Sequence, residues 1–350
     1  MRNEHREWYS DKGVLIDFYK ALEVSCNARI EVVDSAYKAL IKLVHEDKGM
    51  SHKTNTILNL ARDALTENRE EYDKRYFGRN DRVVGSYEIL EKIGEGGFGF
   101  TYKAKHRILE ELVCIKQSRE VSEKDEEILL NESKVIWDLR HVGLPSMRDI
   151  LRLDDGSLAL VMSYISDPSF DKILKKVDKL SAEHVSWIAE RTLNVLGYMH
   201  YNGVVHGDIK PGNMMVNVKD HKITLVDFGL STIRPKSGSS NNGHTPLFAP
   251  PEQISDSSPP TPQTDLYSLG MTMIYSLNGA DNEDDVKASV RKSIPKDVPK
   301  PIKDFIERLI IYNPKERPRW EEENLTETLG KARLEAFGRR RSGVLQIKGL

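Results

Sequence analysis

Two short segments place acidic, amide and basic side chains at spacings that suit chemistry on a phosphate group. They are residues 206–213 (HGDIKPGN) and residues 227–229 (DFG). In phosphoryl transfer, a carboxylate such as Asp208 can accept a hydroxyl proton, and a lysine such as Lys210 can neutralise the γ-phosphate. The amide of Asn213 and the carboxylate of Asp227 are groups that can bind magnesium. Asp and Gly favour turns, so DFG alone has an ordinary explanation, but the two segments together indicate phosphotransfer.

A glycine-rich hairpin precedes these segments. Gly94, Gly96 and Gly99 form a GxGxxG pattern, and glycines let backbone amides approach phosphate oxygens. A dinucleotide-binding motif needs a helix directly after the glycines. Here residues 100–102 continue as a strand, so we exclude that interpretation. A plain glycine hairpin without a ligand is the alternative that this motif alone leaves open.

Lys116 ends the apolar run Val113–Lys116. A lysine inside an apolar strand is costly unless it pairs with a charge. Phosphate oxygens and Glu132, on the charged helix that follows, would supply that pairing. The alternatives are a solvated strand lysine and an ordinary helix glutamate.

The surrounding sequence predicts a small β-rich lobe followed by a larger helical lobe. Residues 87–118 alternate short apolar runs with glycine turns, which is typical of β-hairpins. A charged helix is predicted over residues 123–140 and a buried strand over residues 158–164. From residue 181 onward most segments are helical, with strand-like pieces around residues 214–216 and 223–226.

Residues 1–80 predict a separate all-α domain. Apolar residues recur at helical spacing on either side of the polar loop His45–Asn55. They are Ile30, Val33, Tyr37, Leu40, Ile41 and Val44 in the first run, and Ile57, Ala61, Ala64 and Leu65 in the second. We expect these runs to form an antiparallel helical hairpin. Residues 81–86 read as a linker, and residues 331–350 as a frayed basic tail.

Composition limits the partners. The 350 residues carry a net charge of −2, so no global field favours nucleic acid or membrane. Two cysteines do not make a disulfide framework, which fits a cytoplasmic protein. Because the first ten residues are polar, we expect no signal peptide there. The most apolar stretch, Leu266–Leu277, is too short to span a bilayer and predicts a buried helix.

From Tyr87 to about Leu329 the chain resembles the eukaryotic-type Ser/Thr protein kinases, including their bacterial members. Further matches are residues 250–252 (PPE), Asp265–Gly270 at the start of a central helix, and Arg317, which resembles the arginine that pairs with Glu252. The resemblance implies an α+β, bilobal protein-kinase fold over residues 87–330. It also implies ATP and Mg²⁺ as cofactors and protein substrates, with the chain itself among the candidate substrates.

The same resemblance assigns the site residues. Asp208 would be the catalytic base, acting with Lys210, Lys116 and Glu132, while Asn213 and Asp227 would bind the metal. The nucleotide would lie against Gly94, Gly96, Gly97 and Gly99 of the glycine loop, against Thr101, Cys114 and Met215 around the adenine, against Met162 as gatekeeper, and against the hinge Ser163–Ile165.

One departure from the family pattern concerns regulation. Gly207 replaces the arginine that in many members binds an activation-loop phosphate, which makes this a non-RD kinase in the family's terms. Lys210 and Thr245 match the Ser/Thr pattern. Two alternatives stay open: a small-molecule phosphotransferase, whose catalytic loop also reads H-G-D but which lacks the PPE, Asp265 and Arg317 set, and a non-catalytic kinase-like scaffold linked to chaperones.

The front domain resembles a J-domain, the co-chaperone module. The resemblance rests on Asp17-Phe18-Tyr19, Leu22, Val24, Ala36-Tyr37, Leu40, Leu65-Thr66 and Tyr72-Asp73. The diagnostic His-Pro-Asp tripeptide is replaced by His45-Glu46-Asp47, and the charges on the preceding helix are balanced. We therefore expect a degenerate J-like fold that serves as a spacer or binds a docking partner, without co-chaperone activity.

Overall fold

The computed structural model describes residues 8, 10, 16–24, 28–46, 52–77, 83–96, 99–118, 122–153, 156–235, 243, 245–255, 259–279, 294–338 and 347. The chain divides into two compact units. The first comprises Met1–Leu130 and Met147–Tyr164, and the second comprises Asn131–Ser146 and Ile165–Leu350. Helix α5 (Glu123–Trp137) contributes its first half to one unit and its second half to the other.

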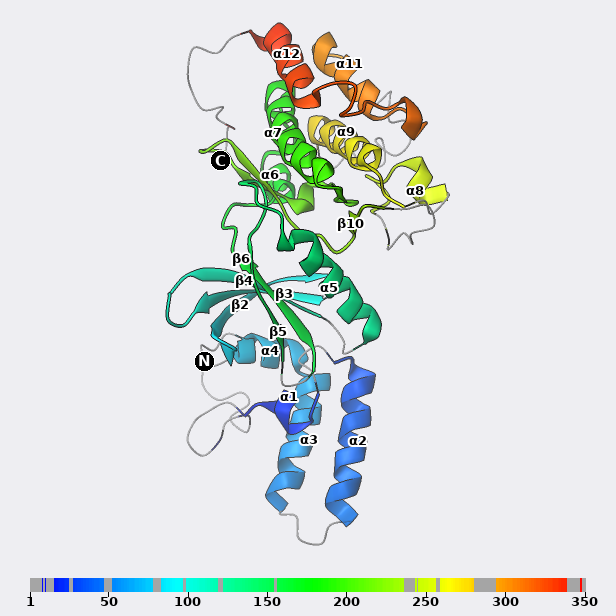
Figure 1. Ribbon diagram of the computed structural model, residues 1–350. Helices are drawn as coiled ribbons and strands as arrows, with labels where there is room; N and C mark the ends of the chain where they lie inside the picture. Colours follow the sequence, from blue (N-terminus) through cyan, green and yellow to red (C-terminus); the bar gives the residue numbers. More distant parts are fainter. Residues whose placement is uncertain are drawn as a thin grey trace. The chain divides into compact units, whose positions relative to one another are not determined.

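The first unit is built on a six-stranded antiparallel sheet in the order β1-β2-β3-β4-β6-β5 (Figure 1). The strands are β1 (Val83–Val84), β2 (Tyr87–Gly96), β3 (Gly99–His106), β4 (Leu112–Ser118), β5 (Met147–Arg152) and β6 (Leu158–Ser163). Alternating buried and half-buried residues along β3 and β4 confirm the predicted β-hairpins. The predicted strand over residues 158–164 is β6.

Four front helices precede the sheet: α1 (Phe18–Ala21), α2 (Ile30–Glu46), α3 (His52–Thr66) and α4 (Arg69–Phe77). Helices α2 and α3 pack side by side, as the helical spacing predicted (Figure 1). The connection between them is shorter than expected, because His45 and Glu46 still belong to α2 and α3 begins at His52. Asp47 and the side chains of His45 and Glu46, which carry the J-domain comparison, lie outside the described residues.

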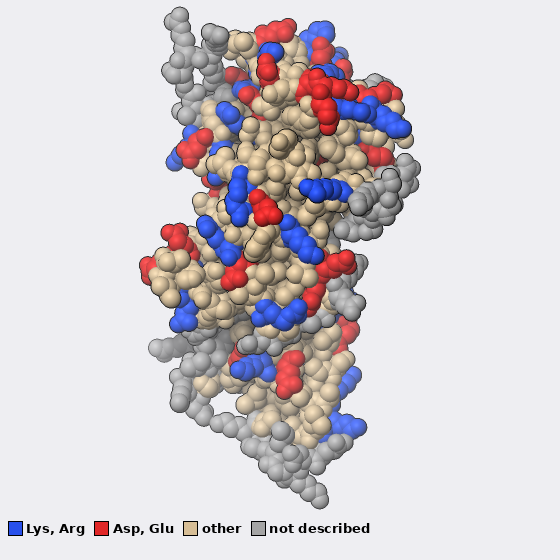
Figure 2. Space-filling view, in the orientation of Figure 1, with Lys and Arg blue, Asp and Glu red and all other residues tan. Residues whose placement is uncertain are grey.

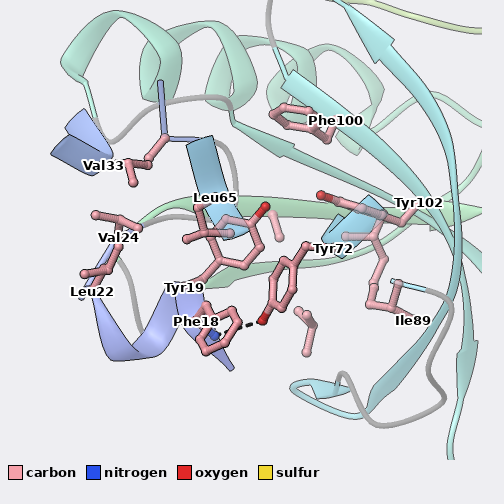
Figure 3. Packing of buried hydrophobic residues seen from close by; sticks show 14 of the residues in the cluster. Phe18, Tyr19, Leu22, Val24, Val33, Leu65, Tyr72, Ile89, Phe100 and Tyr102 are labelled. Atoms are coloured by element: carbon pink, nitrogen blue, oxygen red, sulfur yellow. Dashed lines mark hydrogen bonds between the residues drawn. The ribbon is translucent and has the colours of Figure 1, made fainter. Parts of the chain in front are cut away.

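One face of the sheet, called here the outer face and defined by Tyr102, Ile115 and Val161, shares one hydrophobic core with the front helices. Strand partners directly opposite each other point to the same face of a sheet. On this basis Tyr102, Ile115 and Val161 form one row. All three belong to the same buried cluster as Phe18, Tyr19, Leu22, Val33, Leu65 and Tyr72 of the front helices (Figure 3). Ile30, predicted as part of the buried stripe, is instead 49% exposed.

Tyr72 on α4 lies at the centre of the front part of this core. Its ring stacks on Phe18, with centroids 5.0 Å apart, and on Tyr76 at 5.5 Å. Its hydroxyl donates to the Ile16 carbonyl at 2.7 Å and accepts from the Phe18 amide at 2.8 Å. Tyr72 therefore anchors the start of α1 as well as filling the core, and α4 itself contacts β2.

The second unit is mostly helical, as predicted for residues beyond 181. Helices α7 (Ala182–Tyr201), α9 (Pro262–Asn278), α11 (Lys300–Leu309) and α12 (Leu325–Phe337) pack against one another (Figure 1). Other elements of this unit are α6 (Phe170–Val177), α8 (Pro251–Ser255), and the 3₁₀ turns η2 (Pro211–Asn213) and η5 (Pro314–Glu316). Two short two-stranded sheets pair β7 (Val204–Val205) with β10 (Thr232–Ile233) and β8 (Met214–Asn217) with β9 (Lys222–Leu225).

Helix α9 is the centre of this unit. Every residue from Thr264 to Leu277 is buried, which confirms the buried helix predicted over Leu266–Leu277. Helix α12 continues through Phe337, beyond the domain end predicted at residue 330, and Arg333 forms an ion pair with Glu190 of α7. The start of the predicted basic tail is thus ordered helix, whereas Arg339, Arg340 and Arg341 lie outside the described residues.

Charge is mixed over the surface. Figure 2 shows Lys and Arg interspersed with Asp and Glu on the visible face, in keeping with the net charge of −2. Among the described residues, no helix is both long and apolar enough to cross a bilayer.

Candidate active site

The catalytic-loop segment folds around the carboxylate of Asp208. Residues 211–213 form the turn η2, which begins at a proline whose fixed φ suits a first helical position. This turn brings Asn213 back onto Asp208, where its amide nitrogen donates to the Asp208 carbonyl at 2.9 Å and to Oδ2 at 3.0 Å. Both partners are acceptors, so the amide orientation of Asn213 is determined. The Asp208 side chain is only 8% exposed.

Two more groups complete the surroundings of this carboxylate. Lys210 Nζ lies 2.7 Å from Asp208 Oδ2. The hydroxyl of Thr245 donates to Asp208 Oδ1 at 2.6 Å and accepts from Lys210 Nζ at 2.8 Å. Thr245 therefore contacts two residues of the catalytic loop. A hydroxyl hydrogen bonded to Asp208 with an ammonium beside it is the arrangement that general-base activation of an alcohol requires.

The backbone just before Asp208 is held from α9. Asp265 is fully buried and accepts from the His206 amide through Oδ2 and from the Gly207 amide through Oδ1, each at 2.8 Å. Gly207 has φ +79°, and a Cβ atom there would lie 2.7 Å from the Leu230 carbonyl oxygen. The structure therefore gives Gly207 a role beyond the absence of the family's arginine. Glycine allows the left-handed backbone and the close approach to Leu230.

His206 supports the catalytic loop from within the core. It is fully buried, its Nδ1 accepts from the Asp208 amide at 3.3 Å, and its Nε2 lies 3.3 Å from the Val226 carbonyl. Its ring packs against Phe228, with centroids 5.2 Å apart. Both ring nitrogens thus contact backbone groups.

The DFG segment follows β9 after one residue, Val226, and is linked to α5. Asp227 has φ +68°, a left-handed conformation that aspartate enters more readily than most residues. The Phe228 amide donates to Glu132 Oε1 at 3.3 Å, and Glu132 is 1% exposed. Asn131 also donates to the Ser231 carbonyl at 2.8 Å. The second half of α5 is therefore hydrogen-bonded to the segment that carries the predicted metal carboxylate.

Glu252 and Arg317 form the ion pair that the sequence predicted. Arg317 Nη1 and Nη2 lie 2.6 and 2.8 Å from the two oxygens of Glu252, in the bidentate geometry that suits a guanidinium. The Arg317 side chain is 0% exposed and also donates to the carbonyls of Ile311, Tyr312 and Gln263. This pair ties α8, which begins at the second proline of the Pro-Pro pair, to the segment after α11.

The predicted nucleotide residues of the first unit share the inner face of its sheet, opposite the hydrophobic core. Gly94 pairs with Thr101, Thr101 with Lys116, and Cys114 with Met162. Cys114 and Lys116 are two positions apart on β4, so all five point to one face. At Gly99, a Cβ would lie 2.0 Å from the Gln117 carbonyl oxygen, which is why this corner of the hairpin needs glycine.

The other predicted residues are distributed as follows. Ser163 ends β6 in the first unit, and Ile165 begins the second unit. Met215 lies on β8 opposite Thr224 and forms a bridge with Ser169. Gly96 ends β2, and Gly97 lies outside the described residues. Lys116 and Glu132 belong to different units, so their pairing stays a prediction.

The family model of the protein kinase domain matches residues 87–327. This chain belongs to the protein kinase family. The match covers both the glycine-rich sheet and the helical unit that carries Asp208, and it agrees with the PPE segment and the Glu252–Arg317 pair that distinguish protein kinases from small-molecule phosphotransferases.

Similar proteins carry the same family's names. The chain is 30% identical over 264 residues to serine/threonine-protein kinase F of Synechocystis sp., covering 67% of this chain and 53% of that protein. It is 33% identical over 217 residues to serine/threonine-protein kinase D of Synechocystis sp., covering 57% and 42%. It is 30% identical over 251 residues to Aurora kinase of Schizosaccharomyces pombe, covering 67% and 68%. The chain thus spans about half the length of the two Synechocystis relatives.

Proposed function

We propose that this kinase transfers the γ-phosphate of ATP to serine or threonine hydroxyls of proteins, with Asp208 as the base that accepts the hydroxyl proton. The observation that carries the proposal is the Thr245 hydroxyl, which donates to Asp208 Oδ1 at 2.6 Å while Lys210 lies 2.7 Å from Oδ2. A substrate hydroxyl that took a similar position would be hydrogen-bonded to its base. The neighbouring ammonium would offset negative charge that develops on the transferring phosphoryl group.

Asn213 and Asp227 suit a magnesium site. Magnesium prefers hard oxygen ligands, and a bound ion would neutralise phosphate charge. Asn213 uses its amide nitrogen in both contacts to Asp208, so its oxygen is the atom that would bind a cation. In the sheet, Lys116 would pair with phosphate oxygens and with Glu132, and the shared face of Thr101, Cys114 and Met162 would receive the adenine.

The decisive test is phosphotransfer by the purified full-length chain. The protein is incubated with γ-labelled ATP, magnesium and a cell lysate, and phosphorylated residues are identified by mass spectrometry. We expect phosphoserine and phosphothreonine that disappear with Asp208→Asn. A phosphoproteome dominated by phosphotyrosine would contradict the acceptor class. Nucleotide binding without any transfer would instead identify a kinase-like scaffold.

We further propose that catalysis does not depend on phosphorylation of the activation loop. Gly207 offers no cation to a loop phosphate, which would carry a charge of about −1.5 to −2. The loop serines Ser237, Ser239 and Ser240 lie outside the described residues. Replacing all three with alanine, followed by phosphatase treatment, should leave the initial rate on a peptide within about tenfold, or ~1.4 kcal/mol in the barrier. A larger loss would show that the phosphate finds another cationic partner.

For the front helices we propose a J-like docking module that does not stimulate an ATPase chaperone. Glu46 replaces the proline that would rigidify the tripeptide by fixing φ. Since these helices share a core with the sheet, the test uses the full-length chain rather than a fragment. Heat-shock-type ATPase rates should not change when it is added. Clear stimulation would show that Glu46 is compatible with co-chaperone activity.

A further inference from the structure

A hydrogen-bond chain reaches the catalytic loop from Trp320, a half-buried residue that no sequence motif marks. His200, near the end of α7, places Nε2 2.8 Å from Asp265 Oδ2. Trp320 Nε1 lies 2.7 Å from the other ring nitrogen of this histidine, Nδ1. The side chains of His200 and Asp265 are 3% and 0% exposed. The chain therefore runs from Trp320 through His200 to the carboxylate that holds the loop backbone.

The donor and acceptor roles in this chain follow from its first member. An indole nitrogen can only donate, so His200 Nδ1 must accept and cannot carry a proton. The imidazole is then neutral with its proton on Nε2, which is the nitrogen that faces Asp265. A histidine whose tautomer is determined by one nitrogen presents a fixed donor at the other.

The His200 donor matters because the two carboxylate oxygens of Asp265 accept three hydrogen bonds, two of them from the catalytic-loop backbone. Oδ2 accepts from both His200 Nε2 and the His206 amide, while Oδ1 accepts from the Gly207 amide. The two amides immediately precede Asp208. A buried carboxylate keeps its position through such hydrogen bonds, and losing one of them leaves charge without compensation.

Trp320 is itself held in place. Its six-membered ring packs against Gly197 of α7, where an added Cβ would lie 3.3–3.6 Å from three ring atoms. It follows Arg317 by three residues, and Arg317 is fixed by Glu252 and by three backbone carbonyls. The hydrogen-bond chain therefore begins at an anchored segment of the fold.

We propose that Trp320 is a positioning residue for phosphotransfer: its indole N–H fixes the tautomer of His200, and His200 in turn orients Asp265 and the backbone that carries Asp208. The kinetic part of this inference rests on the proposed kinase function, whereas the tautomer of His200 does not. Without the indole donor, the proton of His200 is free to move to Nδ1. An unprotonated Nε2 would then face Asp265 and repel it.

The test compares two Trp→Phe variants of the full-length protein. Trp320→Phe removes an N–H that donates a hydrogen bond. Trp187→Phe, also in the helical unit, removes an N–H that has no hydrogen-bond partner within the described part of the chain, from a side chain that is 2% exposed. Both variants replace an indole with a phenyl ring. The difference in activity between them therefore reports the lost hydrogen bond.

We expect Trp320→Phe to lower kcat about five- to twentyfold relative to Trp187→Phe, with KM for ATP within about twofold. The reason is that the hydrogen-bond chain ends at the loop that carries Asp208 and not at the nucleotide residues of the sheet. Equal effects of the two variants on kcat would overturn the proposal. So would a loss that appears only in KM for ATP.

The second readout is the protonation state of the His200 ring nitrogens, measured by long-range ¹H–¹⁵N correlation NMR and assigned with His200→Gln. The wild-type protein should show a protonated Nε2 and an unprotonated Nδ1, and Trp320→Phe should shift that balance. A wild-type ring protonated on Nδ1 would overturn the inference whether or not the protein is active. If the wild type has the expected tautomer but transfers no phosphate, the proposed function fails and the tautomer assignment stands.

A pair of amide variants tests whether His200 donates a hydrogen bond to Asp265. The same pair provides a test if Trp320→Phe does not fold. His200→Gln places an amide nitrogen near the position of Nε2 and can still donate to Asp265. His200→Asn places its amide near Nδ1 and can satisfy only Trp320. We expect His200→Gln to retain at least about fivefold more activity than His200→Asn. The reverse order would show that Asp265 does not receive its support from His200.

Discussion

The surroundings of Asp208 and the core beneath the front helices are both buried, but different forces hold them together. Around Asp208, a few polar contacts of 2.6–3.0 Å from Thr245, Lys210 and Asn213 determine one arrangement. Beneath the front helices, apolar and aromatic side chains from the helices and from strands β1, β2, β3, β4 and β6 fill a common cluster. The first region depends on a few directional contacts, and the second on contact area shared by many residues.

This difference predicts different responses to substitution. A buried polar network loses most of its function when one partner is removed, because the remaining groups are left uncompensated. An apolar core loses stability roughly in proportion to the volume removed. Single changes near Asp208 should therefore act mainly on catalysis, and single changes in the front core mainly on stability.

The largest effect is expected from Asp208→Asn. It removes the proposed base and should lower turnover about 10²–10⁴-fold, while nucleotide binding is retained. The matched control is Asp171→Asn, which removes a carboxylate from the exposed pair with Lys175. Rates come from steady-state assays and binding from calorimetry. Wild-type turnover by Asp208→Asn would show that the polar contacts around Asp208 do not control catalysis.

Arg317→Ala should have the largest effect on stability. It leaves Glu252 and three carbonyls without their donor, and breaking a buried ion pair costs about 3–5 kcal/mol. The control is Arg308→Ala, because Arg308 is 43% exposed in its pair with Glu323, and exposed pairs contribute about 0–1 kcal/mol. Denaturant unfolding measures both variants. Equal midpoints would show that the buried pair adds little to stability.

Leu65→Ala tests whether the front helices and the sheet share one cooperative core. Leu65 is fully buried in the common cluster (Figure 3), and truncation should cost about 2–5 kcal/mol. Leu43, which is 58% exposed on α2, provides the control, with an expected change within about 0.5 kcal/mol. Hydrogen exchange should show protection lost in α2, α3 and β3 together. Loss confined to the helices would mean that the shared cluster does not couple them.

The smallest effect is expected from Tyr72→Phe, which removes a polar contact from the apolar region. The ring remains, but the Ile16 carbonyl and the Phe18 amide lose their partner, at a cost of about 1–3 kcal/mol. The control is Tyr201→Phe, because Tyr201 is 91% exposed. Thermal melting compares the two. A Tyr72→Phe protein as stable as its control would place all of Tyr72's contribution in ring packing.

The sequence determined the features that depend on neighbours along the chain. The catalytic loop could be predicted because Asp208, Lys210 and Asn213 lie within six positions of one another, so a single turn brings them together. The alternating pattern of β3 and β4 and the apolar run of α9 follow from the periodicity of each element. Resemblance to the kinase family added one distant pairing, Glu252 with Arg317, and the structure contains it.

Tertiary structure decided the contacts between residues that no local pattern connects. Nothing in the spacing joins Trp320 to His200, 120 positions away, and a periodic run does not reveal which neighbour it will pack against. Ile30 fits the helical stripe but is exposed, whereas Val33 one turn later is fully buried, because burial depends on the partner surface as well as on periodicity. For the same reason, the sequence predicted a front domain of its own, and only the folded chain placed its core against the outer face of the sheet.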